Sequence, residues 1–521
     1  MHLYLISGLL LYLAEPPFGL WPLAFIALIP TMHAAHRARN YRSAALGGFL
    51  AGAAFFLPGL FWLTSTTIIG WAALSLYCAT YVAVFALLVR WTSNTIALAA
   101  GWILLEFVRG AIAFTGFPWL LLSHSQYRFT PFTQIIDVIG SYGLSGLLIA
   151  LNALIWTGAI SGRRKNLWVA AGIVAGVCVY GFIRVQTVTL RPALDVAVVQ
   201  ASVPQEMKEA LEGTYDPAGG LKKYLDASAT IPGDRKVDLL VWPETVVLSP
   251  YTLNVDPAIL NDALADDARF AQESLGRLAK THNSYFLAGS TSFLPASHGY
   301  VSDPQVASRI PSGNWGRRYN SAYLLDPSGR YVDRYDKMHL VPFGEYIPLR
   351  GTLPFLARFV PFDASLSEGE KQTIFQMKRD GQTLKFGVLI CYEDTDSELA
   401  RRLRRDGADF FVNISNDAWF GLSELDQHYV TARFRAVENR VGVVRSGNNG
   451  LSGVIDPLGR SVILLDKNQI GNASGGLWVT DSRSLFTQVG DWPGVAASGL
   501  ILIFEFSRRK RTTDKQLRSR V

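Results

Sequence analysis

Hydrophobic positions are concentrated in two parts of the 521-residue chain. Residues 1–186 are nearly free of charge outside a few short clusters, and a further apolar run lies near the C-terminus. A helix needs about 20 apolar residues to cross the hydrocarbon core of a bilayer. The pattern therefore predicts about eight membrane-spanning helices, near residues 3–14, 20–35, 44–64, 70–90, 95–113, 136–160, 167–184 and 489–506.

Basic residues lie beside these apolar segments in a pattern that indicates orientation. Clusters follow the second, fourth, sixth and last predicted spans, at 37–42, at Arg90, at 163–165 and in the tail after Phe506. Loops rich in Lys and Arg remain on the cytoplasmic side of a membrane. All four clusters agree if both chain ends are cytoplasmic, which places the long polar segment outside the cytoplasm. We interpret the N-terminus as a first span, because it lacks the basic leader of a signal peptide.

The same pattern divides the chain. We expect seven transmembrane helices in 1–188, an extracytoplasmic domain in 189–485, a transmembrane helix in 486–507 and a basic cytoplasmic tail in 508–521. The chain is 49% hydrophobic, with a mean hydropathy of +0.20, as expected for membrane spans joined to a globular domain. The net charge of +7 comes largely from the orienting clusters, so it does not indicate nucleic-acid binding.

Within the polar segment, short apolar runs alternate with helical patterns. Runs rich in β-branched residues and bounded by Gly, Pro or Asp predict strands at 194–200, 237–244, 284–292, 321–329, 385–393, 409–417 and 441–447. Helical spacing occurs at 266–282, 396–406 and 426–440. Several strands are apolar on both faces, so helices must cover both sides of the sheet. We predict a layered α/β domain with hairpin turns at 328–329 and 457–459.

Cys391 ends one strand-like run and is the only cysteine of the polar segment, because Cys78 and Cys178 lie in apolar stretches. The carboxyl edge of a strand is where open α/β sheets have their sites. A lone cysteine is also commonly a small buried hydrophobic residue. The polar run CYEDTDSE argues against deep burial. A covalent nucleophile is thus one of two open interpretations.

Two further charged residues follow strand-like runs. Glu244 ends the run VWPE and can take the thiol proton as a general base. Lys337 lies mid-domain, where an ammonium beside the thiol favours the thiolate and then neutralises a tetrahedral oxyanion. The backbone N–H of Tyr392 is a natural second donor, and Glu345 can orient Lys337 or shuttle protons. Taken alone, each charged residue is more commonly structural or solvated than catalytic.

Together, these three residues resemble the Glu-Lys-Cys triad of the nitrilase superfamily, in the same chain order. Further segments resemble the membrane-embedded branch of that superfamily, the apolipoprotein N-acyltransferases. They are TGFPWLLLSHSQY (115–127), HLVPFGEYIP (339–348), CYE (391–393), NISNDAWFG (413–421), QH (427–428), RFRAVENR (433–440) and RSGNNGLSGVIDPLG (445–459). The resemblance covers essentially the whole chain. One departure is LSELD at 422–426, where the family often has a Gly-Pro pair, and it leaves the geometry of this loop open.

The resemblance implies an αββα sandwich for 189–485 and an enzyme of the bacterial inner membrane, with its catalytic domain on the periplasmic side. It implies that Cys391 is the nucleophile, Glu244 the general base and acid, and Lys337 the oxyanion stabiliser. Three residues would support them, namely Glu345, Tyr392 and Glu393. The acyl chain of a phospholipid, typically phosphatidylethanolamine, would pass through a thioester to the α-amine of the diacylglyceryl-cysteine of a prolipoprotein. This is the last step of lipoprotein maturation. No cofactor or metal is implied, and we expect a monomer in contact with membrane lipids.

Other side chains can be interpreted either as functional or as structural. Four aromatic residues are candidates for contacting the lipid substrates, namely Trp119, Trp242, Trp419 and Phe420. The alternatives are a membrane-interface belt or a hydrophobic core. Glu106 and Arg109 lie at i and i+3 on the fifth predicted span, and we expect a buried ion pair that stabilises the bundle.

Two other functional classes fit parts of the pattern. A membrane-tethered nitrilase-type amidase acting on a small soluble amide would share the triad, but an anchor needs only one span. A transporter or scaffold would predict charged or broken helices, whereas the predicted spans are almost free of charge. The cysteine count excludes a disulfide framework in the polar segment. No Cys/His spacing typical of a metal site occurs there.

Overall fold

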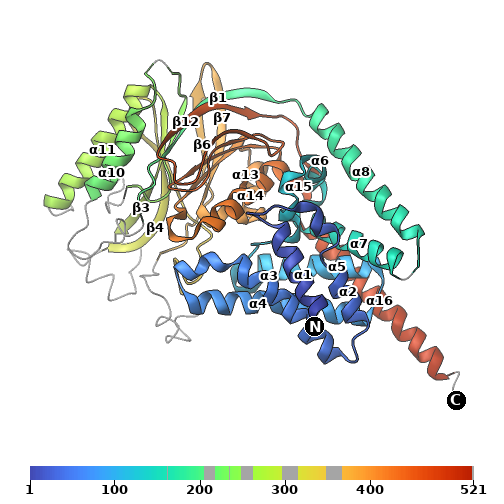
Figure 1. The fold of residues 1–521 in the computed structure, drawn as a ribbon. Helices are drawn as coiled ribbons and strands as arrows, with labels where there is room; N and C mark the ends of the chain where they lie inside the picture. Colours follow the sequence, from blue (N-terminus) through green and yellow to red (C-terminus); the bar gives the residue numbers. More distant parts are fainter. Residues whose placement is uncertain are drawn as a thin grey trace. The chain divides into compact units, whose positions relative to one another are not determined.

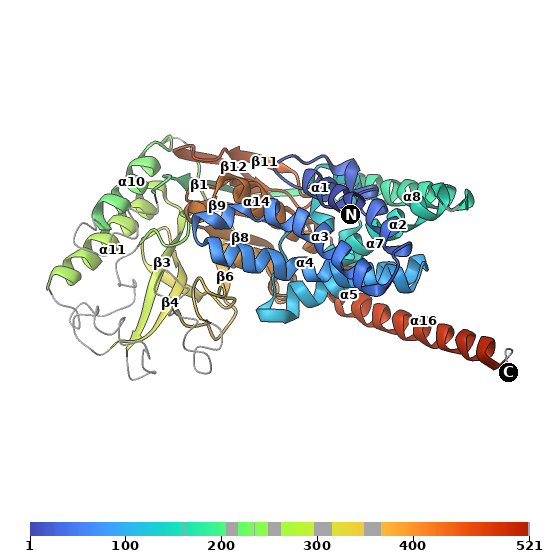
Figure 2. The same ribbon diagram turned by 60° about the horizontal axis from the view of Figure 1, so that its bottom comes forward.

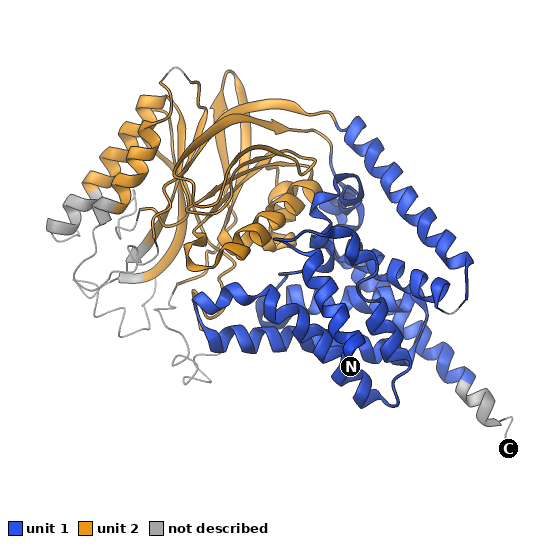
Figure 3. Cartoon of the chain, viewed as in Figure 1, with its two compact units in different colours: residues 1–188, 483–521 blue, residues 189–482 orange. Residues whose placement is uncertain are grey.

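The structure, a computed structural model, describes residues 1–160, 162–204, 217–233, 235–247, 262–295, 315–347 and 366–518. The chain forms two compact units, Met1–Val188 with Arg483–Val521, and Thr189–Ser482 (Figure 3). The first unit is helical. The second unit contains two β-sheets and the helices that cover them (Figures 1 and 2).

Four helical segments of the first unit are long and apolar enough to cross a membrane, among the residues described: α4 (Ile68–Trp91), Thr95–Thr115, which begins with α5 (Thr95–Phe107), α7 (Ile136–Ala159) and α8 (Lys165–Thr187). The other α-helices are α1 (His2–Ala14), α2 (Ile29–His36), α3 (Tyr41–Gly59), α6 (Thr130–Thr133), α15 (Leu485–Val489) and α16 (Trp492–Arg518). The segment predicted as a span near 20–35 is not one continuous helix but two short ones, η1 (Trp21–Phe25) and α2. Pro22 and Pro30 each lie at the start of a separate short helix, where proline is tolerated.

Small residues bring α3 and α4 close together. A Cβ on Gly52 would lie 2.6 Å from the Cα of Ala79, and a Cβ on Gly48 would lie 2.5 Å from the Cβ of Ala86. Close backbone approach of this kind replaces the hydrophobic effect as the driving force for helix association in lipid. The small residues of α3 therefore determine how tightly this part of the helical unit packs.

The second unit contains two six-stranded sheets, with strand orders β12-β1-β2-β3-β4-β5 and β11-β10-β9-β8-β7-β6. Strands β1, β2 and β3 are parallel, as are β7, β8 and β9, and the remaining pairs are antiparallel. The strands are β1 (Arg191–Gln200), β2 (Leu239–Val241), β3 (Tyr285–Pro295), β4 (Trp315–Leu325), β5 (Tyr331–Asp336), β6 (Ile374–Arg379), β7 (Gln382–Ile390), β8 (Phe410–Ser415), β9 (Gly442–Gly447), β10 (Ser452–Ile455), β11 (Ser461–Leu465) and β12 (Gly471–Val479).

The two sheets face each other across one hydrophobic layer, to which both sheets contribute buried side chains. The outer face of the first sheet packs against α10 (Pro217–Ala229) and α11 (Asp262–His282). The outer face of the second sheet packs against α13 (Ser397–Arg405) and α14 (Leu422–Asn439) (Figure 1). This unit is therefore an αββα sandwich, and the predicted layered α/β fold is confirmed.

The seven predicted strands correspond to β1, β2, β3, β4, β7, β8 and β9, and the three predicted helices to α11, α13 and α14. Both predicted hairpin turns occur, with positive φ values of 76° at Gly329 and 78° at Gly459. Strands β5, β6, β10, β11 and β12 and helix α10 were not predicted. In β12, glycine replaces the branched side chains that mark a strand in the sequence.

Candidate active site

Strand ends of the α/β unit bring three predicted site residues together. Glu244 follows β2, Lys337 directly follows β5, and Cys391 begins the short helix η9 (Cys391–Thr395) directly after β7. Lys337 Nζ lies 3.8 Å from Glu244 Oε1, and both groups interact electrostatically with the Cys391 thiol. The site therefore combines strand ends from both sheets of the sandwich.

Lys337 is the cation of this site. Its side chain is 1% exposed, and its Nζ lies 2.9 Å from Glu345 Oε1. Burial alone would lower the pKa of Lys337, but the carboxylates of Glu345 and Glu244 and the sulfur of Cys391 raise it above its usual value. The ammonium is therefore retained at neutral pH and faces both carboxylates.

Glu244 is held by hydrogen bonds from two sides. Asn320 Nδ2 donates to its Oε1 at 2.6 Å, and the backbone N–H of Asn416 donates to its Oε2 at 2.7 Å. Asn320 Nδ2 also lies 3.1 Å from Glu345 Oε1, so one amide group bridges two carboxylates. The backbone N–H of Val341 donates to the other oxygen of Glu345 at 2.8 Å. These contacts fix the orientation of both carboxylates relative to Lys337.

Cys391 has an unusual backbone conformation. Its φ is +52°, in the left-handed region that costs a residue with a Cβ about 1–2 kcal/mol. Its carbonyl oxygen lies 3.3 Å from Asn413 Nδ2 and 3.3 Å from His428 Nε2. Burial and the Glu244 carboxylate raise the pKa of the Cys391 thiol, while Lys337 and His428 oppose this shift. The resting thiol is therefore protonated and needs a base to become a nucleophile.

Glu393 is buried and accepts hydrogen bonds on both oxygens. Its donors are Tyr335 Oη (2.7 Å) and the backbone N–H groups of Met338 (2.7 Å), His339 (3.0 Å) and Ile390 (2.7 Å). Three of these donors lie beside Lys337, and the fourth precedes Cys391. With both oxygens engaged, Glu393 ties the lysine segment to the cysteine turn, and this arrangement favours positioning over proton transfer.

The candidate aromatic residues lie in different surroundings. Trp242 is fully buried between the first sheet and its helices, where its Nε1 donates to Ser228 Oγ at 2.9 Å. Trp419 and Phe420 are half-buried and follow β8. The ring of Tyr392 packs edge-on against His339, at 5.5 Å between centroids. The surroundings of Trp242 thus favour a packing role for this residue.

The sequence analysis missed a second set of charged side chains in this unit. We name it the buried charge cluster, and it consists of Asp394, Asp417, Glu424, His428 and Arg445, each at most 1% exposed. His428 Nδ1 lies 3.0 Å from Asp417 Oδ1 and 3.2 Å from Glu424 Oε1. His428 Nε2 lies 3.0 Å from Asp394 Oδ1. Arg445 Nη2 and Nη1 lie 2.9 Å from Asp417 Oδ2 and 3.3 Å from Asp394 Oδ2.

Charge pairing explains the ionisation of this cluster. Burial alone would lower the pKa of His428, but the Asp394 and Asp417 carboxylates hold it well above its usual value. Burial and the neighbouring Asp417 raise the pKa of Glu424 to about 7. The available signal in the sequence was that Asp394, Asp417 and Arg445 all lie at or near the ends of neighbouring strands.

Three residues of this cluster have the donor types of a metal site. The ligand atoms of Asp417, Glu424 and His428 lie within 4.8 Å of one another. However, both nitrogens of His428 already face carboxylate oxygens, and Arg445 already pairs with Asp417. A doubly protonated imidazole has no lone pair for a metal. The arrangement therefore favours internal ion pairs over metal binding.

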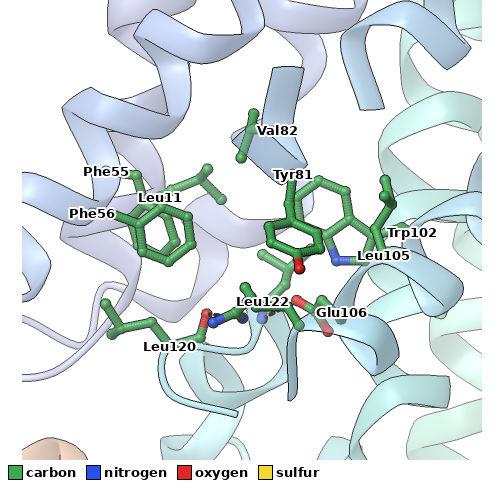
Figure 4. Close-up of a pocket in the computed structure, with 11 residues that line it drawn as sticks. Leu11, Phe55, Phe56, Tyr81, Val82, Trp102, Leu105, Glu106, Leu120 and Leu122 are labelled. Atoms are coloured by element: carbon green, nitrogen blue, oxygen red, sulfur yellow. Dashed lines mark hydrogen bonds between the residues drawn. The ribbon is translucent and has the colours of Figure 1, made fainter. Parts of the chain in front are cut away.

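Glu106 and Arg109 of the helical unit are both buried and line an apolar pocket with Tyr81 (Figure 4). Arg109 donates to the backbone carbonyl oxygens of Phe117 (3.0 Å), Trp119 (2.7 Å) and Leu120 (3.4 Å). Glu106 Oε1 accepts a hydrogen bond from the N–H of Leu122 at 2.9 Å. Instead of a simple ion pair, the two side chains hold the loop that contains Trp119. Trp119 itself is 3% exposed and packs on Trp62.

Comparison with known proteins gives two family matches. Residues 7–154 match the family described as apolipoprotein N-acyltransferase N-terminal domain, and residues 195–473 match the carbon-nitrogen hydrolase family. A protein of Geobacter metallireducens named apolipoprotein N-acyltransferase is 31% identical, with 97% of this chain and 95% of that protein covered. A protein of the same name from Rhodopseudomonas palustris is 29% identical, with 97% and 94% covered.

Two solved structures are also similar to this chain. An amidase from Nesterenkonia sp. is 18% identical with a TM-score of 0.37, and the match covers 58% of this chain and 95% of the amidase. A nitrilase-superfamily protein of Saccharomyces cerevisiae is 22% identical with a TM-score of 0.37, covering 55% and 91%.

Proposed function

The chain belongs to the apolipoprotein N-acyltransferase family, and from this premise we propose a two-step acyl transfer through Cys391. The acyl donor is a phospholipid, typically phosphatidylethanolamine, and the acceptor is the N-terminal amine of a diacylglyceryl-cysteine in a prolipoprotein. The observation that carries the proposal is the buried Lys337 ammonium beside Glu244 and the Cys391 thiol. A thiol, a carboxylate and a fixed cation are the groups that covalent acyl transfer requires.

In the first step, Glu244 takes the proton of the Cys391 thiol, and the sulfur attacks the carbonyl carbon of the sn-1 ester. The ammonium of Lys337 stabilises the oxyanion that forms, because it is a pre-oriented charge in a site removed from water. The ester C–O bond then breaks, and the leaving alkoxide takes the proton from Glu244. The products are a lysophospholipid and a thioester on Cys391.

In the second step, the α-amine of the lipoprotein attacks the thioester carbonyl. Glu244 accepts a proton from the amine, Lys337 again faces the oxyanion, and the C–S bond breaks to leave an amide. The thiolate recovers its proton from Glu244. Asn320 supports this double role, because it holds Glu244 and Glu345 in place through both steps.

The proposal includes the membrane topology. About eight helices cross the bacterial inner membrane, with both termini cytoplasmic and the α/β unit on the periplasmic side as a monomer. The four apolar helical segments and the basic clusters support it. Accessibility of a single cysteine introduced at Ser519 to a membrane-impermeant maleimide tests the orientation. Labelling of intact spheroplasts at this position would contradict a cytoplasmic C-terminus.

The test of the chemistry is an intact-mass measurement. The full chain, purified in detergent, is incubated with phosphatidylethanolamine and no acceptor. We expect a mass increase of one acyl chain, mapped to Cys391 and removed by hydroxylamine. Cys391→Ala should lose the adduct, while Cys178→Ala keeps it. Addition of a diacylglyceryl peptide should then discharge the adduct and form an N-acylated peptide.

The alternative function is a membrane-tethered amidase for a small soluble amide, and the same experiment separates the two. An unmodified Cys391 that still reacts with iodoacetamide would contradict phospholipid as the donor. Hydrolysis of a small amide by the same preparation would then identify the amidase.

A further inference from the structure

The backbone turn at Cys391 is held by side chains that contact its carbonyl oxygen. A residue with a Cβ avoids the left-handed region unless its surroundings impose it, and Cys391 has a φ of +52°. Two side chains reach its carbonyl oxygen, Asn413 from β8 and His428 from α14, each at 3.3 Å. Neither takes part in the transfer steps described above.

The contacts of His428 fix its protonation. Nε2 faces the Cys391 carbonyl oxygen and Asp394 Oδ1, and neither is a donor, so this nitrogen carries a proton. Nδ1 faces Asp417 Oδ1 at 3.0 Å, and Arg445 and His428 hold the pKa of Asp417 below its usual value, so this nitrogen is also a donor. His428 is therefore an imidazolium.

The charged groups around this imidazolium come from four elements. Asp394 lies on η9, Asp417 on the turn after β8, Glu424 one turn earlier on the same helix, and Arg445 on β9. The carboxylates favour the positive charge of His428 and Arg445 opposes it. With two carboxylates paired to two cations, the charge of His428 is balanced and remains in place.

We propose that His428 is a positioning residue for acyl transfer, which holds the Cys391 carbonyl and the left-handed turn. In addition to Lys337, it provides a second buried cation near Cys391 that favours the thiolate. This inference rests on the proposed role of Cys391. His428 forms no bond with a substrate and keeps both of its protons throughout. Its effect is on the ionisation and the orientation of the thiol.

The test uses His428→Gln in the full chain, purified in detergent. The amide keeps a hydrogen-bond donor but removes the charge. Alkylation of Cys391 by iodoacetamide, followed by peptide mass spectrometry, gives the pH midpoint of thiolate formation. We expect this midpoint to rise by about one pH unit, and acyl-enzyme formation at neutral pH to slow about tenfold, because fewer molecules carry the thiolate.

The matched control is Tyr429→Phe on the same helix. Its hydroxyl bonds to Ser461 Oγ at 2.7 Å, away from Cys391, so its removal disturbs the packing of α14 but not the charge. We expect the wild-type midpoint and rate for this variant. A purely structural role of α14 would instead give both variants the same loss of rate, with no change in the midpoint.

The outcomes separate this inference from the proposed function. Alkylation needs no substrate, so a raised midpoint in His428→Gln supports the inference even if the wild type forms no acyl-enzyme with phospholipid. A wild type that is acylated, together with a His428→Gln variant of unchanged midpoint and rate, would overturn the inference and leave the proposed function standing.

If His428→Gln does not fold, the unaltered chain gives the answer. The protein has eight histidines, and ¹⁵N labelling of their rings distinguishes an imidazolium from a neutral ring. We expect an imidazolium signal that persists at pH 8 and is retained in His339→Asn, since His339 is another histidine paired with a carboxylate. Conversion of every histidine to the neutral form by pH 8 would overturn the inference.

Discussion

Two sets of buried charges in the α/β unit differ in how completely they are paired. Around Lys337, one ammonium faces two carboxylates and a thiol. A carboxylate without its own cation can accept the thiol proton. In the buried charge cluster, His428 and Arg445 each lie within ion-pair distance of the carboxyl groups of Asp394 and Asp417. The comparison suggests that incomplete pairing permits reaction, whereas complete pairing fixes geometry.

Removal of the single cation of the first set should have the largest effect. Lys337→Met leaves the carboxylates of Glu244 and Glu345 buried without their counterion, which costs about 3–5 kcal/mol of folding free energy. It also removes the oxyanion partner, so acyl-enzyme formation should fall by about a thousandfold. Intact mass against time measures the rate, and thermal unfolding measures the stability. Lys385→Met, at an exposed site on β7, should change neither.

Glu424, the third carboxyl group of the second set, gives a pH-dependent prediction. The pKa of Glu424 is about 7 in the fold, against an ordinary value of 4.5. Between these values the folded protein holds a proton that the unfolded chain has lost. Stability therefore falls as pH rises through this window, by up to about 3 kcal/mol.

Glu424→Gln removes that proton equilibrium. We expect the stability of the variant relative to wild type to increase between pH 5 and pH 8, as measured by thermal unfolding in detergent. A constant difference between the two proteins across this range would show that Glu424 has an ordinary pKa. The Glu424 carboxylate would then add a third negative charge to the buried charge cluster, which has two cations. The cluster would no longer be completely paired, in contradiction to the comparison with the Lys337 site.

Asn320→Ala should have an intermediate effect. The amide bridges Glu244 and Glu345, and its loss leaves both carboxylates with one donor fewer, at a cost of about 1–3 kcal/mol. Acyl-enzyme formation should slow by tenfold or more, because a reoriented Glu244 is a poorer base. The matched control is Asn472→Ala. Asn472 lies on the edge strand β12, and its side-chain amide donates to Thr230 Oγ1. An equal loss in both variants would refute a specific role for Asn320.

The smallest effect is expected at the outer surface of α14. Lys467 Nζ pairs with Asp426 Oδ2 at 2.8 Å, and both side chains are about a quarter exposed. Exposed pairs of this kind contribute less than about 1 kcal/mol. Lys467→Ala should therefore leave acylation and the Cys391 midpoint unchanged. A larger effect would mean that the exposed pair of Lys467 and Asp426 positions α14, and not the buried charge cluster.

Glu244 and Cys391 were found because each ends or follows a short apolar run of the sequence. Lys337 follows the polar run YVDRYD, which was not predicted as a strand, so its role was assigned only through the resemblance to the nitrilase triad. Asn320 was not visible, because it lies within β4, and only its antiparallel pairing with β5 brings it beside Lys337. His428 was missed for a related reason. Its partners are distant in the chain, and only the packing of α14 on the second sheet assembles them.

In the helical unit, hydropathy identified the long apolar helices. It did not detect breaks within an apolar segment, because it is an average over many residues. The segment 20–35 is apolar throughout, yet two prolines divide it. Glu106 and Arg109 were correctly predicted to share a buried location, but their partners are backbone groups of a loop. Side-chain spacing along one helix cannot reveal such partners.

The Glu393 contacts join the two sheets. Its donors Tyr335 and Met338 belong to the first sheet and the segment that follows it, whereas Ile390 ends a strand of the second. Lys337 and Cys391 are divided between the sheets in the same way. The spacing between the sheets, set by the hydrophobic layer, is consequently also the spacing between cation and nucleophile. Removal of a methylene group from that layer, even far from the site, is therefore expected to change the distance between Lys337 and Cys391.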